Sequence, residues 1–124
     1  MTGYSVAIKD SSKELNPKEK VMLKDVSDAI KLDEATKDGP LTLTIEAWVQ
    51  LAIHNEKSDN KDYDNYVLIA KDGTKFVTGS ESFWSSFMDI FSDMAGYDGE
   101  WAIKCYRLPS KNYKGKEFLT CSLI

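Results

Sequence analysis

Hydrophobic and polar residues alternate along the middle of the chain. In LTLTIEAWVQLAI (41–53), hydrophobic residues occupy every second position from Leu41 to Ile53, and mostly polar residues lie between them. A period of two is typical of a strand with one face in a core. The stretch therefore predicts a long, half-buried strand whose polar face carries one large aromatic side chain, that of Trp48.

Two shorter hydrophobic segments follow in DNYVLIAKDGTKFVT (64–78), on either side of Asp72-Gly73. This dipeptide tolerates the positive φ angles of a tight turn, so the segments predict a hairpin. The preceding stretch HNEKSDNKDYDN (54–65) has no hydrophobic period and predicts a loop, and its acidic residues do not follow the spacing of a calcium loop.

The period changes in SESFWSSFMDIFSDMAG (80–96). Ser80 or Ser82 can cap the start of a helix, Gly96 follows its end, and one stripe carries Phe83, Phe87, Ile90, Phe91 and Met94. We expect an amphipathic helix whose aromatic stripe is buried on a sheet. Next, EWAIKCYRL (100–108) and EFLTCSLI (117–124) predict two strands joined by the loop PSKNYKGK (109–116).

The N-terminal third has a weaker pattern. YSVAI, KVMLKDV and AIKLDEA predict an opening strand and one bent or interrupted strand before the turn KDGP. The order of elements predicts an α+β, mainly β fold: one OB-fold-like, five-stranded barrel with a helix between the third and fourth strands. A length of 124 residues with 42% hydrophobic content suits a single domain over residues 1–124.

Charge is distributed unevenly along this chain, whose formal net charge is −4. Residues 1–100 carry 11 Lys against 19 acidic residues, a net charge of −8, whereas residues 101–124 carry four Lys and one Arg against Glu117 alone, a net charge of +4. A segregated basic segment can attract a polyanion while the acidic remainder repels non-specific contacts. A solvated basic loop is the simpler interpretation.

The last hairpin indicates which side chains could form a binding surface. If Cys105 and Cys121 lie opposite each other, the inner face carries Ile103, Cys105, Leu119, Cys121 and Leu123, and the outer face carries Lys104, Tyr106, Thr120 and Ser122. Arg107 then points inward at a strand end. Exposed rings beside ammonium groups suit single-stranded nucleic acid, whose bases stack on aromatics while its phosphates meet cations. The predicted binding residues are Trp48, Lys104, Tyr106, Lys111, Tyr113, Lys114 and Lys116.

Other chemistry has little support in the sequence. His54 is the only histidine and has no nucleophile at a recognisable spacing, no glycine-rich phosphate loop occurs, and the two cysteines are interpreted as structural thiols. We therefore expect no enzyme, no metal, no cofactor and no small-molecule substrate. With no hydrophobic run of about 20 residues and no signal-like start, we expect no membrane partner and a cytoplasmic location.

Three further stretches form a recognisable combination: DGPLTLTIEA entering the long strand, LIAKDGTKF before the helix cap, and the closing PSKNYKGKEFLTCSLI with its Ser-x-x-x-Lys-Gly run. Together they resemble the small single-stranded DNA-binding proteins encoded by tailed, protein-primed Bacillus phages. The resemblance covers residues 38–124 and implies non-catalytic coating of displaced strands during phage replication, in a host cytoplasm and beside phage replication proteins. At the level of single residues, the resemblance can be carried over only to Lys111, Lys114 and Gly115 in the closing loop.

Two functions remain open from the sequence. The first is sequence-tolerant binding and protection of single-stranded DNA during replication. The second is a phage-borne protein-interaction module or inhibitor of a host or defence protein, whose acidic surface, including Asp59, Asp62 and Asp64, imitates nucleic acid. The overall negative charge favours the second function, and the clustering of rings and lysines favours the first.

Overall fold

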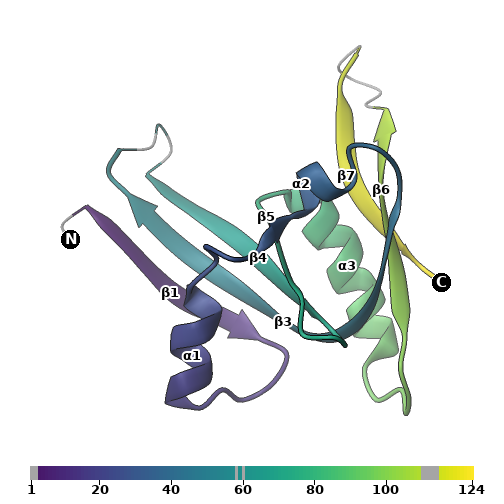
Figure 1. Cartoon of the computed structure of the whole chain (residues 1–124), viewed down its shortest axis with the longest axis horizontal. Coiled ribbons are helices and arrows are strands. Elements are labelled where there is room, and N and C mark those ends of the chain that lie inside the picture. Colours follow the sequence, from purple (N-terminus) through teal and green to yellow (C-terminus); the bar gives the residue numbers. More distant parts are fainter. Residues whose placement is uncertain (1–2, 58, 60, 110–114) are drawn as a thin grey trace.

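Strands make up most of the structure, a computed structural model that describes residues 3–57, 59, 61–109 and 115–124 (Figure 1). The described residues form seven strands and three helices, in the order β1 (Tyr4–Ser11), α1 (Pro17–Lys24), β2 (Ile30–Lys31), α2 (Leu32–Ala35), β3 (Leu41–Asn55), β4 (Asp62–Ala70), β5 (Lys75–Thr78), α3 (Glu81–Met94), β6 (Ala102–Pro109) and β7 (Glu117–Leu123).

The strands form one curled sheet with the order β2-β5-β4-β3-β6-β7, and β1 pairs with the second half of β3. Only β2 and β5 are parallel among the pairs of described strands. In Figure 1 the sheet bends so that β6 and β7 stand away from β4, with α3 between them. The predicted mainly β, barrel-like architecture is confirmed. The prediction of five strands is wrong, because the described residues form seven; the predicted opening strand at YSVAI is confirmed as β1.

The long predicted strand is confirmed as β3, which bends as it crosses the sheet. Leu41–Thr44 pair with β6, whereas the second half of β3 pairs with β4 on one side and β1 on the other. The pairing with β4 shifts between Ile45 and Ala47, as a β-bulge requires. Because successive side chains alternate between faces, one extra residue reverses the face that each later side chain occupies.

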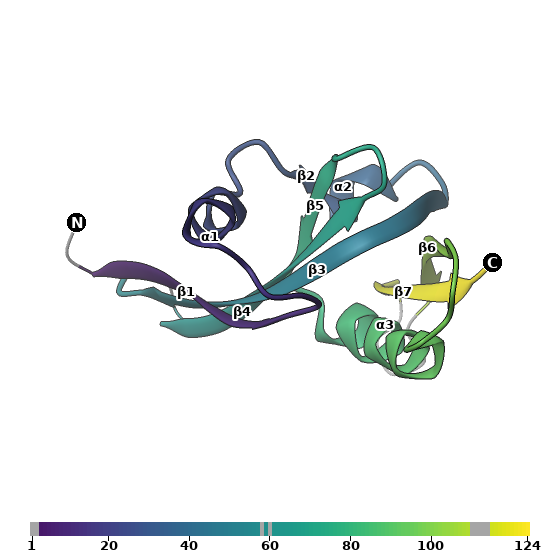
Figure 2. The same cartoon turned by 90° about the horizontal axis from the view of Figure 1, so that it is seen from below.

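Both faces of β3 are buried just beyond the bulge, at Trp48 and Val49. Trp48 belongs to a core beneath α3, whereas Val49, Leu51 and Ile53 belong to a second core that includes Leu23 of α1. Figure 2 shows α1 and α3 on opposite sides of the sheet. The half-buried pattern therefore fails just beyond the bulge, whereas from Gln50 onward the buried Leu51 and Ile53 again alternate with partly exposed residues.

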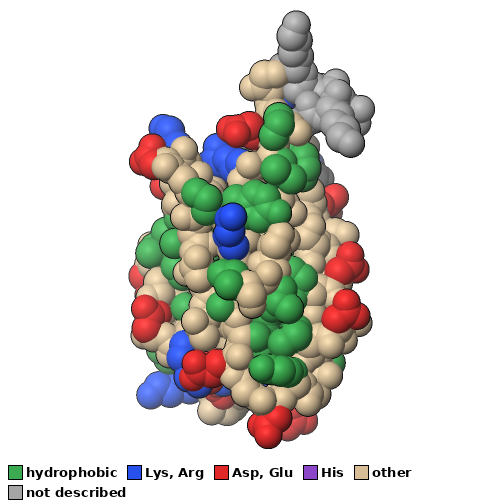
Figure 3. All heavy atoms as spheres, turned by 90° about the vertical axis from the view of Figure 1, so that its right-hand side faces the viewer, with side chains coloured by type: hydrophobic (Ala, Val, Ile, Leu, Met, Phe, Trp, Pro, Cys, Tyr) green, Lys and Arg blue, Asp and Glu red, His purple; other side chains and the backbone are tan. Residues whose placement is uncertain are grey.

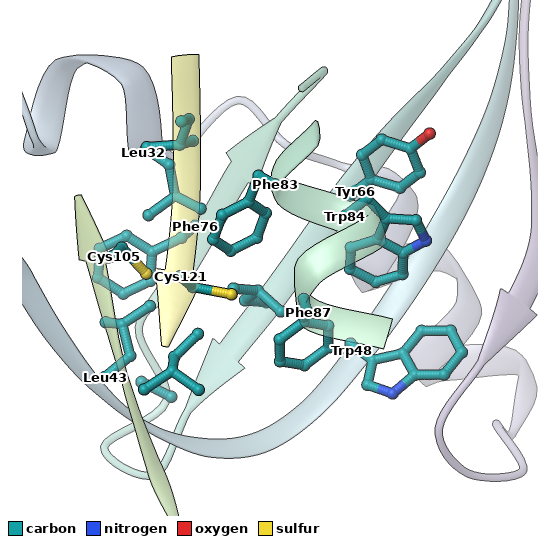
Figure 4. Packing of buried hydrophobic residues seen from close by; sticks show 14 residues of the cluster. Leu32, Leu43, Trp48, Tyr66, Phe76, Phe83, Trp84, Phe87, Cys105 and Cys121 are labelled. Carbon is teal, nitrogen blue, oxygen red and sulfur yellow. The ribbon is translucent and has the colours of Figure 1, made fainter. Parts of the chain in front are cut away.

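The predicted helix is confirmed as α3. Ser80 Oγ accepts a hydrogen bond from the Phe83 N–H at 3.2 Å, and Gly96 lies just beyond the helix with a φ of 85°. Phe83 and Phe87 are fully buried, and Trp84 stacks on Tyr66 with ring centroids 4.5 Å apart (Figure 4). The aromatic stripe is thus a core, as the sequence predicts.

Polar side chains of α3 attach the helix to β7. Ser82 Oγ donates to the Leu119 carbonyl at 3.0 Å, and the hydroxyls of Ser86 and Thr120 lie 3.1 Å apart. These contacts place α3 alongside β7, where it fills the space between that strand and β4. The helix thereby contributes to the wall of the half-barrel.

Both predicted hairpins are confirmed. Gly73 has a φ of 91° in the turn between β4 and β5, where the Asp72 carboxylate accepts a hydrogen bond from the Thr74 N–H. In the closing hairpin, Cys105 lies opposite Cys121 as the alternation predicts. The loop predicted at 54–65 is shorter, because β3 continues to Asn55 and β4 begins at Asp62.

The prediction of a bent strand in the N-terminal third is wrong, because Pro17–Lys24 form α1. Asn16 caps this helix: its side chain accepts from the Glu19 N–H at 2.8 Å, and Glu19 Oε1 accepts from the Asn16 N–H at 3.2 Å. Pro17 at the first helical position supports the same start. The sequence NPKE contains this capping signal, but the short hydrophobic alternations around it are interpreted as a strand.

Lys75 of β5 ties the end of α1 to the sheet. Its Nζ donates to the carbonyl oxygens of Met22 and Asp25 at 3.1 and 2.9 Å, and it lies 2.9 Å from the Asp28 carboxylate. A cation at the end of a helix also complements the helix dipole. These bonds hold α1 over the face of β4 and β5, which its buried Leu23 helps to cover.

Candidate nucleic-acid interface

The predicted binding residues fall into three groups in the structure. Lys111, Tyr113 and Lys114 lie outside the described residues. Lys104, Tyr106 and Lys116 lie on the β6–β7 hairpin or at its end, with both lysines exposed and Tyr106 half-buried. Trp48 is the exception, because it lies in the core beneath α3.

Lys104 and Tyr106 form an organised pair on the outer face of the hairpin. The Tyr106 hydroxyl lies 2.6 Å from Ser122 Oγ on the neighbouring strand, and Lys104 Nζ lies 5.3 Å from the centroid of the tyrosine ring. The hydrogen bond fixes the ring, and the ammonium group is within the range of a cation–π contact. In such an arrangement the ring can stack on a flat group while the neighbouring ammonium group attracts an anion attached to it.

Two hydrophobic residues extend this face toward the tip of the hairpin. Leu108 and Phe118 are cross-strand partners, and their side chains are 40% and 37% exposed. They share the face of Tyr106 because both strands alternate from the buried Cys105 and Cys121 pair. Leu108 and Phe118 are not among the predicted binding residues, although the predicted register already places both on the outer face. We call Lys104, Tyr106, Leu108, Phe118 and Ser122 the hairpin face.

Figure 3 looks onto the side of the molecule that carries the hairpin. Hydrophobic side chains gather along the middle of this view, and acidic side chains lie mainly at its margins. Large exposed hydrophobic side chains that adjoin one another often mark a binding surface. This side of the molecule, where hydrophobic side chains gather around a Lys or Arg side chain, is therefore a candidate binding surface.

The expectation that Trp48 is exposed beside the hairpin is wrong. Its side chain is 3% exposed and lies beneath α3 close to Trp84 (Figure 4). It makes edge-to-face contacts with Trp84 and Phe91, each with ring centroids 5.3 Å apart. The bulge between Ile45 and Ala47 causes this, because it turns Trp48 from the polar face into the core. Trp48 therefore cannot stack on a ligand at the surface.

Two side chains of the hairpin differ in exposure from what their faces suggest. Thr120 lies on the outer face opposite Tyr106, as predicted, yet it is buried because α3 covers it through Ser86. Leu123 lies opposite Ile103 on the inner face, as predicted, yet it is 46% exposed near the end of β7. The inward direction of Arg107 is confirmed, since its Nε donates to the buried hydroxyl of Thr36 at 3.2 Å.

A groove of about 590 Å³ lies elsewhere, on the sheet formed by β1, β3 and β4. Small side chains such as Ala7 and Ala52 line it together with the carboxylates of Asp62, Asp64 and Glu81. Two of these carboxylates already have partners: Asp64 accepts hydrogen bonds from Lys9 and Gln50, and Asp62 lies 2.7 Å from His54 Nδ1. Much of the negative charge in the groove is thus used within the protein.

His54 joins the ends of β3 and β4 through two carboxylates. Its Nε2 lies 2.6 Å from Glu56 and its Nδ1 lies 2.7 Å from Asp62. Both ring nitrogens can donate at once only when the imidazole is protonated. The hydrogen bond to Asp62, and secondarily that to Glu56, raises the pKa of His54 above its ordinary value.

This geometry predicts a pH-dependent contribution to stability. Because the pKa is raised on folding, the stabilisation from His54 is fully present below its unfolded value of about 6.5 and is lost as pH rises through the folded value. Replacing His54 by glutamine should therefore lower the urea midpoint more at about pH 5.5 than at about pH 8.5. Equal losses at the two pH values would contradict the protonated state.

No group of His, Cys, Asp and Glu side chains among residues 3–57, 59, 61–109 and 115–124 is arranged to hold a metal ion. Within the same ranges, none of the helices has the length and hydrophobicity needed to cross a membrane. A comparison of the chain with known protein families, with curated proteins and with solved structures finds no match.

Proposed function

We propose that this protein binds single-stranded DNA, with little dependence on sequence, through the hairpin face. The observation that carries the proposal is the exposed Phe118 beside the fixed ring of Tyr106, with Lys104 Nζ 5.3 Å from that ring. Unpaired bases offer flat faces to such rings, and phosphates offer charge to such cations. A duplex hides its bases, so the exposed rings would gain little from it.

The basic segment 101–124 supports the same proposal. Residues 101–124 have a net charge of +4, and Lys116 is exposed at the end of the hairpin. A surface that combines rings with an excess of positive charge suits a flexible polyanion that carries bases for stacking. An acidic protein offers the negative charge but no bases. The acidic remainder of the chain then limits non-specific contacts with nucleic acid.

A more specific form of the proposal concerns the fold. The strands β3 to β7, with α3 between β5 and β6, follow the order of an OB-fold. OB-folds commonly bind oligonucleotides on their second and third strands, here β4 and β5. In this chain Leu23 of α1 packs with Val67 and Val77 of those strands. The proposed binding surface therefore moves to the fourth and fifth strands, β6 and β7.

The biological setting is proposed from the resemblance to phage single-stranded DNA-binding proteins. In that setting the protein coats and protects displaced strands during phage DNA replication, has no catalytic activity, and works in the host cytoplasm beside phage replication proteins. Its ending, PSKNYKGKEFLTCSLI, contributes both to the resemblance and to the hairpin face.

The second function, an acidic interaction module, has a weaker basis. It needs carboxylates that are available to a partner, and Asp62 and Asp64 are engaged by His54, Lys9 and Gln50. Binding of a host protein that persists when the hairpin face is altered would favour this function over DNA binding.

The proposal is tested by fluorescence anisotropy of a labelled oligo-dT of roughly 20 nucleotides, longer than the sites of about 4–16 nucleotides that single OB-folds occupy. We expect saturable binding that weakens with salt, with a log–log slope of about −0.7 for each phosphate contact. Lys104→Gln should reduce the slope by about 0.7, and joint neutralisation of Lys111, Lys114 and Lys116 should reduce it further. Absence of binding at micromolar protein in about 50 mM salt would refute the proposal.

A further inference from the structure

Cys105 and Cys121 occupy directly opposed positions on β6 and β7. Both thiols are buried and lie on the core side of the hairpin, beneath the hairpin face (Figure 4). Both thiols belong to the core beneath α3, and the proposed DNA contacts use neither of them. The presence of cysteine at both members of this cross-strand pair therefore needs a separate explanation.

The type of strand pair can be derived from one hydrogen bond. The Ile124 N–H donates to the Ala102 carbonyl at 3.1 Å, and these residues continue the register in which Ile103 faces Leu123. Ala102 and Ile124 are therefore a hydrogen-bonded pair. Since hydrogen-bonded and non-hydrogen-bonded pairs alternate along an antiparallel ladder, Cys105 and Cys121 form a non-hydrogen-bonded pair.

This assignment brings the two cysteines as close as paired strands allow. Opposed Cα atoms in a non-hydrogen-bonded pair are about 4.5 Å apart, and their side chains lie nearer to each other than in the other type of pair. Disulfides span Cα separations of roughly 4.4–6.8 Å. The two thiols can consequently be joined without a change in the register of the hairpin.

We propose that Cys105 and Cys121 are a redox-sensitive pair that closes into a disulfide across the β6–β7 hairpin. A low-molecular-weight disulfide is the oxidant. One cysteine thiolate attacks it and releases one small thiol, and the second cysteine then attacks the mixed disulfide and releases the other. The protein loses two protons and two electrons, and the reagent gains both and becomes two thiols.

The surroundings of the thiols control the rate. Burial raises the pKa of both Cys105 and Cys121 to about 12, and the neighbouring Cys121 adds to the effect on Cys105. Thiolate is the reactive form, so the closed hairpin reacts slowly. Oxidation then proceeds through transient opening of the hairpin, after which the second, intramolecular step is fast because the partner lies directly opposite.

The consequence for binding rests on the proposed function. Lys104 and Tyr106 flank Cys105, and Ser122 flanks Cys121, so a bond between the cysteines crosses the strands directly beneath the hairpin face. It would prevent the two strands from separating or bending independently. We expect the affinity of the oxidised protein for oligo-dT to differ several-fold from that of the reduced protein.

The test uses the reduced full-length chain, oxidised glutathione at about pH 8, and intact mass after alkylation under denaturing conditions. The proposal expects a monomer about 2 Da lighter with no thiol available for alkylation, restored by dithiothreitol. Cys105→Ser and Cys121→Ser are matched controls that retain one thiol and can form only adducts or dimers. The disulfide is overturned if the wild-type protein shows two alkylated thiols. It is likewise overturned if the protein carries two glutathione adducts or forms dimers.

The two proposals can be separated by adding the oligo-dT titration. If the bond forms and the affinity is unchanged, the regulatory consequence is overturned while the disulfide stands. If the reduced protein does not bind oligo-dT, the proposed function fails, and the mass measurement still decides the disulfide on its own.

Discussion

Replacing Trp48 by alanine is expected to lower the free energy of unfolding by about 3–5 kcal/mol. The side chain is 3% exposed and contacts the rings of Trp84 and Phe91, so the substitution leaves a large cavity in the core beneath α3. Aromatic pairs add about 0.5–1.5 kcal/mol each beyond area burial. Urea denaturation followed by circular dichroism measures the loss.

Trp48→Phe is the matched control for this prediction. It keeps a ring in the core, and it removes an indole N–H for which no described residue supplies an acceptor, so no hydrogen bond is lost. We expect a clearly smaller loss of stability and unchanged affinity for oligo-dT. A stable Trp48→Ala variant that binds DNA poorly would instead restore the surface role that the sequence predicted.

Replacing Phe118 by alanine is expected to weaken binding of oligo-dT by roughly 5- to 150-fold, the equivalent of one stacked base at about 1–3 kcal/mol. Stability should change little, because the ring is 37% exposed and lies outside the two cores. Phe118→Trp retains a stacking surface and should retain most of the affinity. Anisotropy titrations at one fixed salt concentration compare the variants.

Tyr97→Ala supplies the control at a distant exposed ring. Tyr97 is 58% exposed and lies between α3 and β6, at the opposite end of β6 from the hairpin tip. Its loss should leave the affinity unchanged. If Phe118→Ala and Tyr97→Ala behave alike, the hairpin face is not where bases stack, and the binding surface must be sought elsewhere.

Local patterns in the sequence predict most of the central strands and helices. The alternation from Leu41 to Ile53 identifies β3, and the stripe from Phe83 to Met94 identifies α3, because both patterns extend over several periods. The register of Cys105 with Cys121 also follows from alternation. Phe118 could have been named as a surface residue from that register alone.

The failures have specific physical causes. A bulge between Ile45 and Ala47 breaks the alternation, and its position depends on pairing with β4, which lies far along the chain. The sequence therefore places Trp48 on the wrong face. At the N-terminus, the cap formed by Asn16 and Glu19 outweighs the short alternations that predict a strand. Long-range pairing decides the first case and local capping decides the second.

The pairing of β1 with the far half of β3 has a consequence for the order of folding. Tyr4 meets Asn55, whereas the paired ends of β3 and β4, His54 and Asp62, are only a short turn apart. Loop closure favours the short connection, so the β3–β4 hairpin can form on its own while the N-terminal strand is still unpaired. During synthesis β1 leaves the ribosome before β3. Until β3 has emerged, the hydrophobic residues of β1 are unpaired and accessible to chaperones.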